Sequence, residues 1–376
     1  MVTVPAGLYV HIPFCVKKCS YCAFYSESRD QRAREEYGEM LLHELERRVK
    51  GRKLSTVYAG GGTPTLLTPE FWKLFFTKLN SIADTADVLE LTIETNPGAV
   101  TEKELNELRL IGFNRLSIGV QSFCDAQLRV LGRIHSSKNA LDTFSNARKA
   151  GFRNISIDLM YGVPGLSVKN WVENLKRIEE LDPEHLSCYE LSVEIGTPIS
   201  EAIKRGELSK PDESLCQDMY FAADEILTEF GYSHYEISNY AREDSYISKH
   251  NNAYWNRAPY IGLGPSAHSF NGKASRNWNV SSIDEYLKKS GTGDSAEEGR
   301  EVITTEQAAL EKVMLGLRCS NGIDLEKIES EAGIHINRGY INSMAKQNKA
   351  AFSEGRLLPT AKGMLYADGD AVNLIG

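Results

Sequence analysis

The feature that most constrains the fold is a regular alternation of apolar runs and amphipathic segments along the first two thirds of the chain. Strand-like runs are expected at residues 8–12, 56–59, 89–95, 115–120, 154–160 and 185–193. Between them, apolar residues recur at helical spacing, as at Tyr37, Leu41 and Leu45. Such alternation predicts βα units and a parallel sheet with right-handed crossovers. Six strands are too few for a closed eight-stranded barrel and predict an open one.

The pattern changes after about Gly231. Residues 232–300 are rich in Tyr, Ser, Asn and Gly without clear periodicity, and a flexible loop is expected at 290–299. From Thr304 the apolar spacing is helical again, and a short helix and a hairpin are expected at 357–375. We therefore divide the chain into a barrel domain (1–235), a connecting region (236–300) and a small, mostly helical C-terminal domain (301–376).

Composition and charge limit the class of protein. Lys and Arg number 43 against 51 Asp and Glu, which gives a net charge of −8 and argues against nucleic acid as a partner. No apolar run approaches the roughly 18 residues of a membrane span. The first residues also lack the basic start and apolar core of a secretory signal. These features predict a cytoplasmic protein.

Three of the seven cysteines, Cys15, Cys19 and Cys22, lie within eight residues. Thiolates at this spacing in a loop can converge on one inorganic centre. A structural zinc ion needs four ligands, so His11 would have to complete the set. A four-iron cluster held by three thiolates would keep one iron open to a ligand, and the C-x-x-x-C-x-x-C spacing favours it. The scattered cysteines are expected to be small apolar residues, mostly buried: Cys124, Cys188, Cys216 and Cys319.

This motif and the run Leu8-Tyr-Val-His-Ile-Pro-Phe-Cys15 resemble the radical SAM superfamily, in particular its HemN/HemW branch. The resemblance implies an α/β fold with an open (β/α)6 partial TIM barrel. It also implies a 4Fe–4S cluster on the three cysteines and S-adenosylmethionine (SAM) chelated to the open iron. In the superfamily, the reduced cluster donates an electron to the sulfonium, and homolysis yields a 5′-deoxyadenosyl radical. The protein would hold the cofactor, tune the cluster and exclude water.

Polar residues also stand where the expected strands end, the edge at which βα barrels gather functional groups. Gly60–Pro64 follows the second strand, Glu94 the third and Gln121 the fourth. Each alone has an ordinary explanation, such as a tight turn or an exposed acid, but their joint placement favours a site. By the resemblance, the cofactor-binding residues are Tyr9, Tyr21, Gly61, Gly62, Thr63, Glu94, Gln121, Arg133 and Asp158.

The same branch contains oxygen-independent coproporphyrinogen III oxidases and haem chaperones. The oxidases resemble C-x-x-x-C-x-x-C-x-C, with a fourth cysteine where this chain has Phe24, and they carry a longer N-terminal extension. The run His250-Asn-Asn-Ala-Tyr-Trp255 resembles the H-N-x-x-Y-W motif of the chaperones. Imidazole is a standard axial ligand of haem iron, so His250 is the expected haem ligand, although a packed, hydrogen-bonded histidine is the alternative.

The expected function is therefore that of a haem chaperone that binds haem as cargo and delivers it to acceptor proteins. The alternative is oxidative decarboxylation of coproporphyrinogen III. The acceptor, which can be membrane-associated, and the electron donor are not identified by the sequence. Enzymes of the superfamily that modify transfer RNA are disfavoured because the chain has no basic run. Arg257 is a candidate for a haem propionate, although a solvated surface role is favoured for it.

Overall fold

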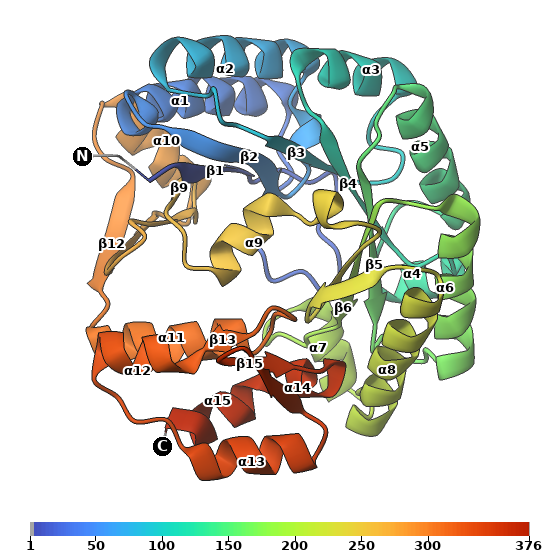
Figure 1. The fold of residues 1–376 in the computed structure, drawn as a ribbon. Coiled ribbons are helices and arrows are strands. Elements are labelled where there is room, and N and C mark those ends of the chain that lie inside the picture. The colour runs from blue at the N-terminus through green and yellow to red at the C-terminus, as the bar shows by residue number, and fades with distance from the viewer. Residues whose placement is uncertain (1–3, 376) are drawn as a thin grey trace.

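The computed structural model describes residues 4–375, in which an open α/β barrel carries a smaller C-terminal domain (Figure 1). The large sheet has twelve strands in the order β12-β11-β10-β9-β1-β2-β3-β4-β5-β6-β8-β7. Its central six strands are parallel and follow chain order, which confirms the predicted (β/α)6 barrel. They are β1 (Ala6–Ile12), β2 (Leu54–Gly61), β3 (Glu90–Thr95), β4 (Arg115–Gln121), β5 (Ile155–Tyr161) and β6 (His185–Glu190).

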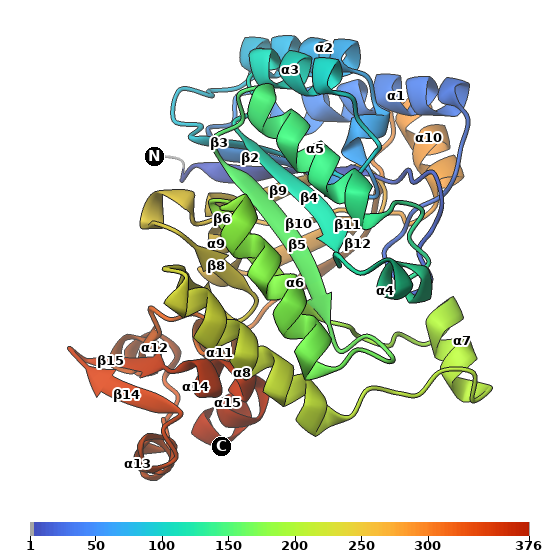
Figure 2. The ribbon, with the colours of Figure 1, turned by 90° about the vertical axis from the view of Figure 1, so that its right-hand side faces the viewer.

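Helices cover the outer face of this sheet, as Figures 1 and 2 show for α5 and α6. Local sequence signals set where they begin. Thr68 accepts a hydrogen bond from the Phe71 N–H at the start of α2, and Thr101 forms a capping box with Glu104 at the start of α3. The barrel helices are α1 (Gln31–Val49), α2 (Pro69–Ile82), α3 (Glu102–Ile111), α4 (Asp125–Val130), α5 (Ser137–Lys149), α6 (Val168–Leu181), α7 (Pro198–Lys204) and α8 (Glu213–Glu229).

The two faces of the barrel sheet differ in chemistry. Successive residues along a strand point to opposite faces of the sheet. On β2, Val57 and Ala59 are fully buried among the apolar residues of the main core, while Thr56 and Tyr58 alternate with them. The inner face is therefore lined by polar groups, and the apolar core lies between sheet and helices. These inner positions include Glu90, Thr92, Glu94, Arg115, Ser117, Ser156, Asp158, His185 and Ser187.

The segment after α8 extends the sheet at both edges. Strands β8 (Asn239–Ala241) and β7 (Ser233–Glu236) continue antiparallel beyond β6. Beyond α9 (Lys249–Trp255), β9 (Tyr260–Leu263) pairs in parallel with β1, and β10 (His268–Phe270), β11 (Ser275–Asn279) and β12 (Glu297–Val302) continue antiparallel. These strands, β7 to β12, have three to six residues each, and this length is too short for a strand periodicity to be recognised in the sequence.

The loop expected at 290–299 is confirmed only in part, because residues 292–296 connect α10 (Ile283–Gly291) to β12 while the two ends of the segment are helix and strand. Its first residues end helix α10, and its last residues begin β12, where Gly299 pairs with Trp278 of β11. The glycine-rich and acidic composition gave a loop signal, but pairing with a neighbouring strand overrides weak strand propensity.

The C-terminal domain has its own apolar core and a three-stranded sheet of order β13-β15-β14. It contacts the barrel through the Ile237 N–H, which donates to the Arg318 carbonyl at 2.8 Å, and the Tyr220 hydroxyl, which donates to the Ala361 carbonyl at 2.9 Å. No helix within residues 4–375 is long and apolar enough to cross a membrane. The elements of the C-terminal domain are α11 (Thr305–Gly316), β13 (Ile323–Asp324), α12 (Leu325–Ala332), α13 (Arg338–Lys346), β14 (Ala350–Ser353), β15 (Arg356–Pro359), α14 (Ala361–Leu365) and α15 (Ala367–Ile375).

Candidate functional site

The three clustered cysteines lie on the loop that follows β1, at the C-terminal edge of the parallel strands. The loop closes on itself through the Cys15 N–H, which donates to the Glu27 carbonyl at 3.0 Å. Ser20 ties it to the end of α4, since its hydroxyl donates to the Val130 carbonyl at 2.8 Å. All three thiols are free and partly buried. The loop therefore presents three soft sulfur ligands from a short, anchored segment.

Polar donors surround the thiols. The Thr63 hydroxyl lies 3.8 Å from the Cys15 sulfur, and one guanidinium nitrogen of Arg133 lies 3.4 Å from the Cys19 sulfur. Burial raises the pKa of the Cys22 thiol, so its thiolate needs a cationic centre. Hydrogen bonds to the sulfurs are one means by which a protein tunes an iron–sulfur cluster. This donor set fits such a cluster.

His11 is not placed to complete a zinc site. One ring nitrogen lies 3.0 Å from the Tyr9 hydroxyl and the other 3.1 Å from the Tyr25 carbonyl, so both already have partners. Within residues 4–375, no three His, Cys, Asp or Glu side chains are gathered as ligands of a single ion. A cubane cluster differs from such a site, because each cysteine binds a different iron atom.

Arg133 links two other expected site residues, Cys19 and Thr63, through a network of hydrogen bonds that we call the strand-end frame. Its second guanidinium nitrogen donates to the Asn96 side-chain oxygen at 2.5 Å and to the Gly119 carbonyl at 2.6 Å. The Asn96 amide donates in turn to the Thr63 hydroxyl at 2.7 Å. The ends of β3 and β4 and the turn after β2 are thereby tied to Cys19. Asn96 links Arg133 to Thr63 in this frame, and the expected set of cofactor residues omits it.

The turn after β2 packs closely against β1. A Cβ on Gly61, whose φ is +109°, would lie 2.5 Å from a His11 ring nitrogen, and a Cβ on Gly62 would lie 2.4 Å from the Phe14 carbonyl. Glycine at these positions is therefore required by the close approach of the two strands. The same approach brings Thr63 beside Cys15.

Glu94 occupies the end of β3 and faces the glycine turn. Its carboxylate accepts hydrogen bonds from the Tyr58 hydroxyl at 2.7 Å and from the Gly61 N–H at 3.2 Å. Burial raises the pKa of this carboxyl to about 7, although the bond from Tyr58 opposes the shift. Near neutral pH the group can therefore be charged or uncharged, and a cationic ligand would favour the charged form.

Asp158 lies one layer deeper, on the inner face of β5. The Ser117 hydroxyl lies 3.2 Å from both carboxylate oxygens, and the Ser156 hydroxyl lies 3.4 Å from one of them. Burial raises the pKa of this carboxyl. The sequence analysis did not name Ser117 and Ser156 as site residues. Strand alternation could have predicted them, because both occupy inward-facing positions of their strands.

Tyr9 and Tyr21 lie on either side of this region. Burial raises the pKa of both phenols, so both act as neutral hydroxyl groups. The Tyr9 ring lies 6.2 Å from the Tyr58 ring on the inner face, and Tyr21 lies beside Arg133 in the cluster loop. Tyr9 is the central residue of β1 and Tyr21 lies in the cluster loop, and contact of either with SAM stays a prediction.

Gln121 ends β4 in a conformation that residues other than glycine rarely adopt, with φ +65°. Its side-chain oxygen is buried without a hydrogen-bond partner in the structure. A buried unpaired amide oxygen costs free energy, so a ligand donor is a natural partner for it. This strained residue and its orphaned oxygen fit a nucleoside-type ligand at the strand ends.

His250 does not offer a free nitrogen to haem iron. It lies in α9, is fully buried, and stacks on Tyr58 at 5.1 Å. One ring nitrogen lies 2.7 Å from the Thr56 hydroxyl and the other 2.9 Å from the Tyr254 hydroxyl. Burial lowers the pKa of His250 to about 3, so the ring is neutral. The structure thus gives this motif the packed, hydrogen-bonded arrangement that was the alternative to haem ligation.

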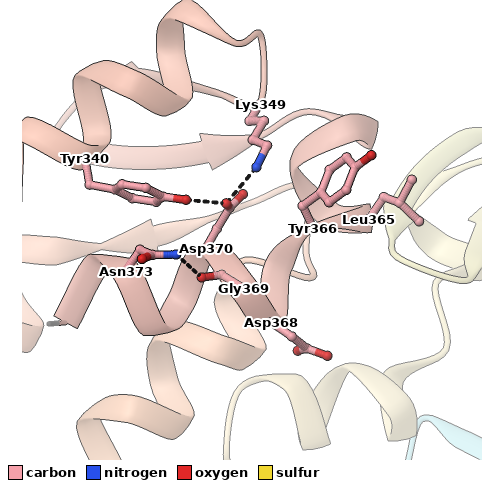
Figure 3. Close-up of a pocket in the computed structure, with 8 residues that line it drawn as sticks. All are labelled: Tyr340, Lys349, Leu365, Tyr366, Asp368, Gly369, Asp370 and Asn373. Atoms are coloured by element: carbon pink, nitrogen blue, oxygen red, sulfur yellow. Dashed lines mark hydrogen bonds and ion pairs between the residues drawn. The ribbon is translucent and has the colours of Figure 1, made fainter.

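A separate hollow of about 370 Å³ lies in the C-terminal domain between α13, α14 and α15 (Figure 3). Its central carboxylate, Asp370, accepts hydrogen bonds from Lys349 and from the Tyr340 hydroxyl, both at 2.8 Å. The buried charge is neutralised locally, and none of the expected site residues lines this hollow. We assign it a structural role within the domain.

Comparison with known proteins agrees with this geometry. The radical SAM superfamily matches residues 9–206, and the HemN C-terminal domain matches residues 303–366. The chain is 32% identical to haem chaperone HemW of Bacillus subtilis over 96% of both chains. It is 35% identical to radical S-adenosyl methionine domain-containing protein 1, mitochondrial, of Danio rerio, over 85% of this chain and 74% of that protein.

A solved structure shares the whole fold. Coproporphyrinogen III oxidase (HemN) of Escherichia coli superposes with a TM-score of 0.84 at 26% identity, over 99% of this chain and 90% of that one. Barrel, added strands and C-terminal domain therefore form one arrangement common to both proteins. Together with the near full-length match to HemW, this places the chain in the radical SAM superfamily, as a member of its HemN/HemW family.

Proposed function

We propose that this protein is a haem chaperone, which binds haem and passes it to an acceptor protein. The observation that carries the proposal is the match to HemW over 96% of both chains, combined with Phe24 in place of a fourth loop cysteine. Phe24 is 73% exposed, so the packing of the loop does not require a phenylalanine there. The difference from the oxidase motif therefore calls for a functional explanation.

Two resident cofactors accompany this function. Cys15, Cys19 and Cys22 would hold a 4Fe–4S cluster, and Thr63 and Arg133 would donate to two of their sulfurs. When reduced, the cluster supplies one electron to bound SAM. The residues that would bind SAM are those of the strand-end frame and its neighbours: Tyr9, Tyr21, Gly61, Gly62, Thr63, Glu94, Gln121, Arg133 and Asp158.

Within this set, the charges of the side chains indicate which group of SAM each residue would contact. Arg133 is the fixed cation of the frame and suits the methionine carboxylate of SAM. Glu94, beside the Gly61 N–H, suits its ammonium group. The unpaired Gln121 oxygen suits a donor of the nucleoside. The domain limits 235 and 300 are kept as part of this proposal, and the HemN C-terminal match to residues 303–366 supports the second.

The second candidate is oxygen-independent oxidation of coproporphyrinogen III, which the fold similarity to HemN favours. One anaerobic experiment separates the two. Protein with reconstituted cluster is incubated with a reductant, SAM and coproporphyrinogen III, and separately titrated with haem. We expect a haem Soret band and no protoporphyrinogen. Formation of protoporphyrinogen at catalytic turnover would establish the oxidase instead.

A further inference from the structure

Both ring nitrogens of His250 are hydrogen-bonded, so a haem chaperone with this structure would need another residue to ligate the haem iron. Four of the eight histidines have both ring nitrogens hydrogen-bonded within the protein: His11, His185, His234 and His250. His135 is buried, and one of its ring nitrogens lies 3.1 Å from the Val120 carbonyl. Of the others, His43 lies on the exposed surface of α1, and His335 lies in the C-terminal domain beside Glu329. His268 of β10 is exposed, and no hydrogen bond found among residues 4–375 uses its ring.

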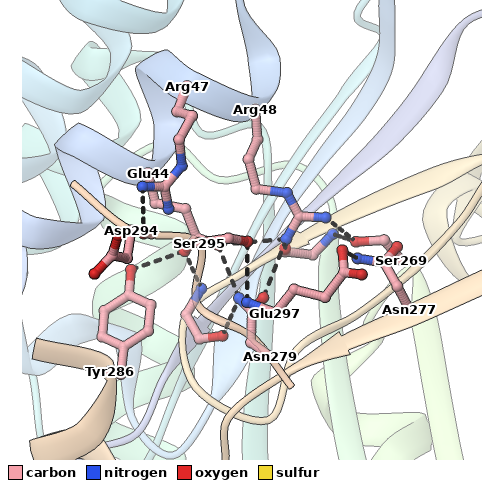
Figure 4. Close-up of polar contacts among 12 residues, drawn as sticks. Glu44, Arg47, Arg48, Ser269, Asn277, Asn279, Tyr286, Asp294, Ser295 and Glu297 are labelled. Atoms are coloured by element: carbon pink, nitrogen blue, oxygen red, sulfur yellow. Dashed lines mark hydrogen bonds and ion pairs between the residues drawn. The ribbon is translucent and has the colours of Figure 1, made fainter. Parts of the chain in front are cut away.

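His268 faces the inside of the barrel. Its neighbour Ser269 accepts a hydrogen bond from Arg48 of α1 at 2.8 Å, and Asn279 of β11 donates to Glu44 of α1 at 2.8 Å (Figure 4). These contacts fix Ser269 and Asn279 on the outer, helix-covered face. Because side chains alternate along a strand, His268 and its cross-strand partner Trp278 lie on the inner face.

The inner face of the added strands is aromatic and continuous with the cofactor region. The His268 and Trp278 rings are nearly parallel, with centroids 5.7 Å apart and an interplanar angle of 28°. Trp278 lies over Gly299 of β12, where a Cβ would come within 2.3 Å of the indole. Along β9, Gly262 pairs with Tyr9, one of the expected SAM residues. A ligand on this face would therefore lie beside the strand-end site.

A buried guanidinium, that of Arg257, packs over the Phe270 ring on this face, 5.0 Å from the ring centroid. The Arg257 side chain is 8% exposed, and its Nε donates to Glu311 of α11 at 2.9 Å. One terminal nitrogen, Nη2, is buried and has no acceptor among residues 4–375. Arg276 shares Glu311 and also pairs with Glu301. The expected solvated role of Arg257 is therefore wrong, and its unpaired donor is matched to an additional carboxylate.

We propose that haem binds to the inner face of β9–β11, with His268 as the axial ligand of the iron and one propionate at Arg257. The inference rests on the proposed haem-chaperone function and moves the ligand from His250 to His268. An exposed, neutral imidazole with free nitrogens can bind iron without breaking a protein hydrogen bond. Trp278 stacks beside the imidazole, and the half-buried rings of Trp278 and Tyr260 offer an apolar surface to the macrocycle. Phe270 is buried between them and the guanidinium groups of Arg257 and Arg276.

The test is a titration of the cluster-containing protein with ferric haem, without SAM, read by difference absorption in the Soret region and by electron paramagnetic resonance of the haem iron. The variants are His268→Ala, His250→Ala and the matched surface control His335→Ala. We expect His335→Ala and His250→Ala to keep the wild-type Soret position. His268→Ala should shift the band and weaken binding by about tenfold or more, and added imidazole should restore the spectrum.

The outcomes separate this inference from the function on which it rests. If wild-type protein binds haem and His268→Ala gives the same spectrum and affinity, the ligand assignment is overturned while the chaperone function stands. If wild-type protein binds no haem, both are overturned. If His250→Ala alone loses the histidine-type spectrum, ligation belongs to the motif helix and the proposal fails. Iron and sulfide contents of each variant verify that the fold is intact.

Discussion

The most informative perturbation is Glu94→Gln, because this carboxyl combines burial with a role proposed for the SAM site. Glu94 accepts hydrogen bonds from Tyr58 and Gly61, and burial raises its pKa from 4.5 to about 7. Glutamine has nearly the same shape but cannot ionise. It can still accept the hydrogen bond from Tyr58 through its amide oxygen. The pH dependence of stability therefore isolates the ionisation of one side chain.

The sign follows from proton binding in the two states. Between pH 4.5 and 7 the folded carboxyl stays protonated while the unfolded one ionises, so the folded protein binds more protons and its stability falls as pH rises. Above pH 7 the carboxyl is ionised in both states, and the full free-energy cost of burying the charged Glu94 is present. A shift of about 2.5 pKa units corresponds to about 3 kcal/mol. Wild-type protein should therefore lose about 3 kcal/mol of stability relative to Glu94→Gln between pH 4.5 and pH 8.

Urea unfolding of both proteins without cofactors, across pH 4.5 to 8, measures this difference. Groups common to both proteins, such as Glu236, whose pKa burial also raises to about 7, cancel in the comparison. Any fixed cost of losing the Gly61 contact shifts the difference equally at every pH. A difference in free energy of unfolding that stays constant across the range would refute the burial argument for Glu94.

Three further outcomes are expected. Cys19→Ala should lose most of the reconstituted iron and sulfide, while Cys124→Ala should keep wild-type content; full content in Cys19→Ala would contradict the cluster assignment. Asp158→Ala should weaken SAM binding about tenfold, or about 1.4 kcal/mol, with the cluster retained. Isothermal titration measures this, and unchanged affinity would remove Asp158 from the site. Gly62→Ala should lower the free energy of unfolding by about 1–3 kcal/mol, because its Cβ would meet the Phe14 carbonyl. Urea unfolding with a midpoint equal to wild type would show that β1 yields easily.

Much of the site could be predicted because its residues stand at recognisable places along the chain. A parallel sheet brings the ends of its strands to one edge, so Glu94 and Gln121 could be placed together without coordinates. Asn96 was visible at the same edge, but its bonds to Thr63 and Arg133 depend on side-chain positions that spacing does not determine.

The sequence by itself determined the parallel barrel, the loop of three cysteines and the row of polar strand ends, because period-2 and helical patterns are local properties of the chain. Only the tertiary structure decided the fate of residues 236–300. Strands of three to six residues acquire stability from partners distant in sequence, and β9 finds its partner in β1. The same packing buries His250 against Thr56 and leaves His268 exposed on the inner face. Burial and hydrogen bonding of a histidine depend on which segments meet around it, and local sequence does not encode that meeting.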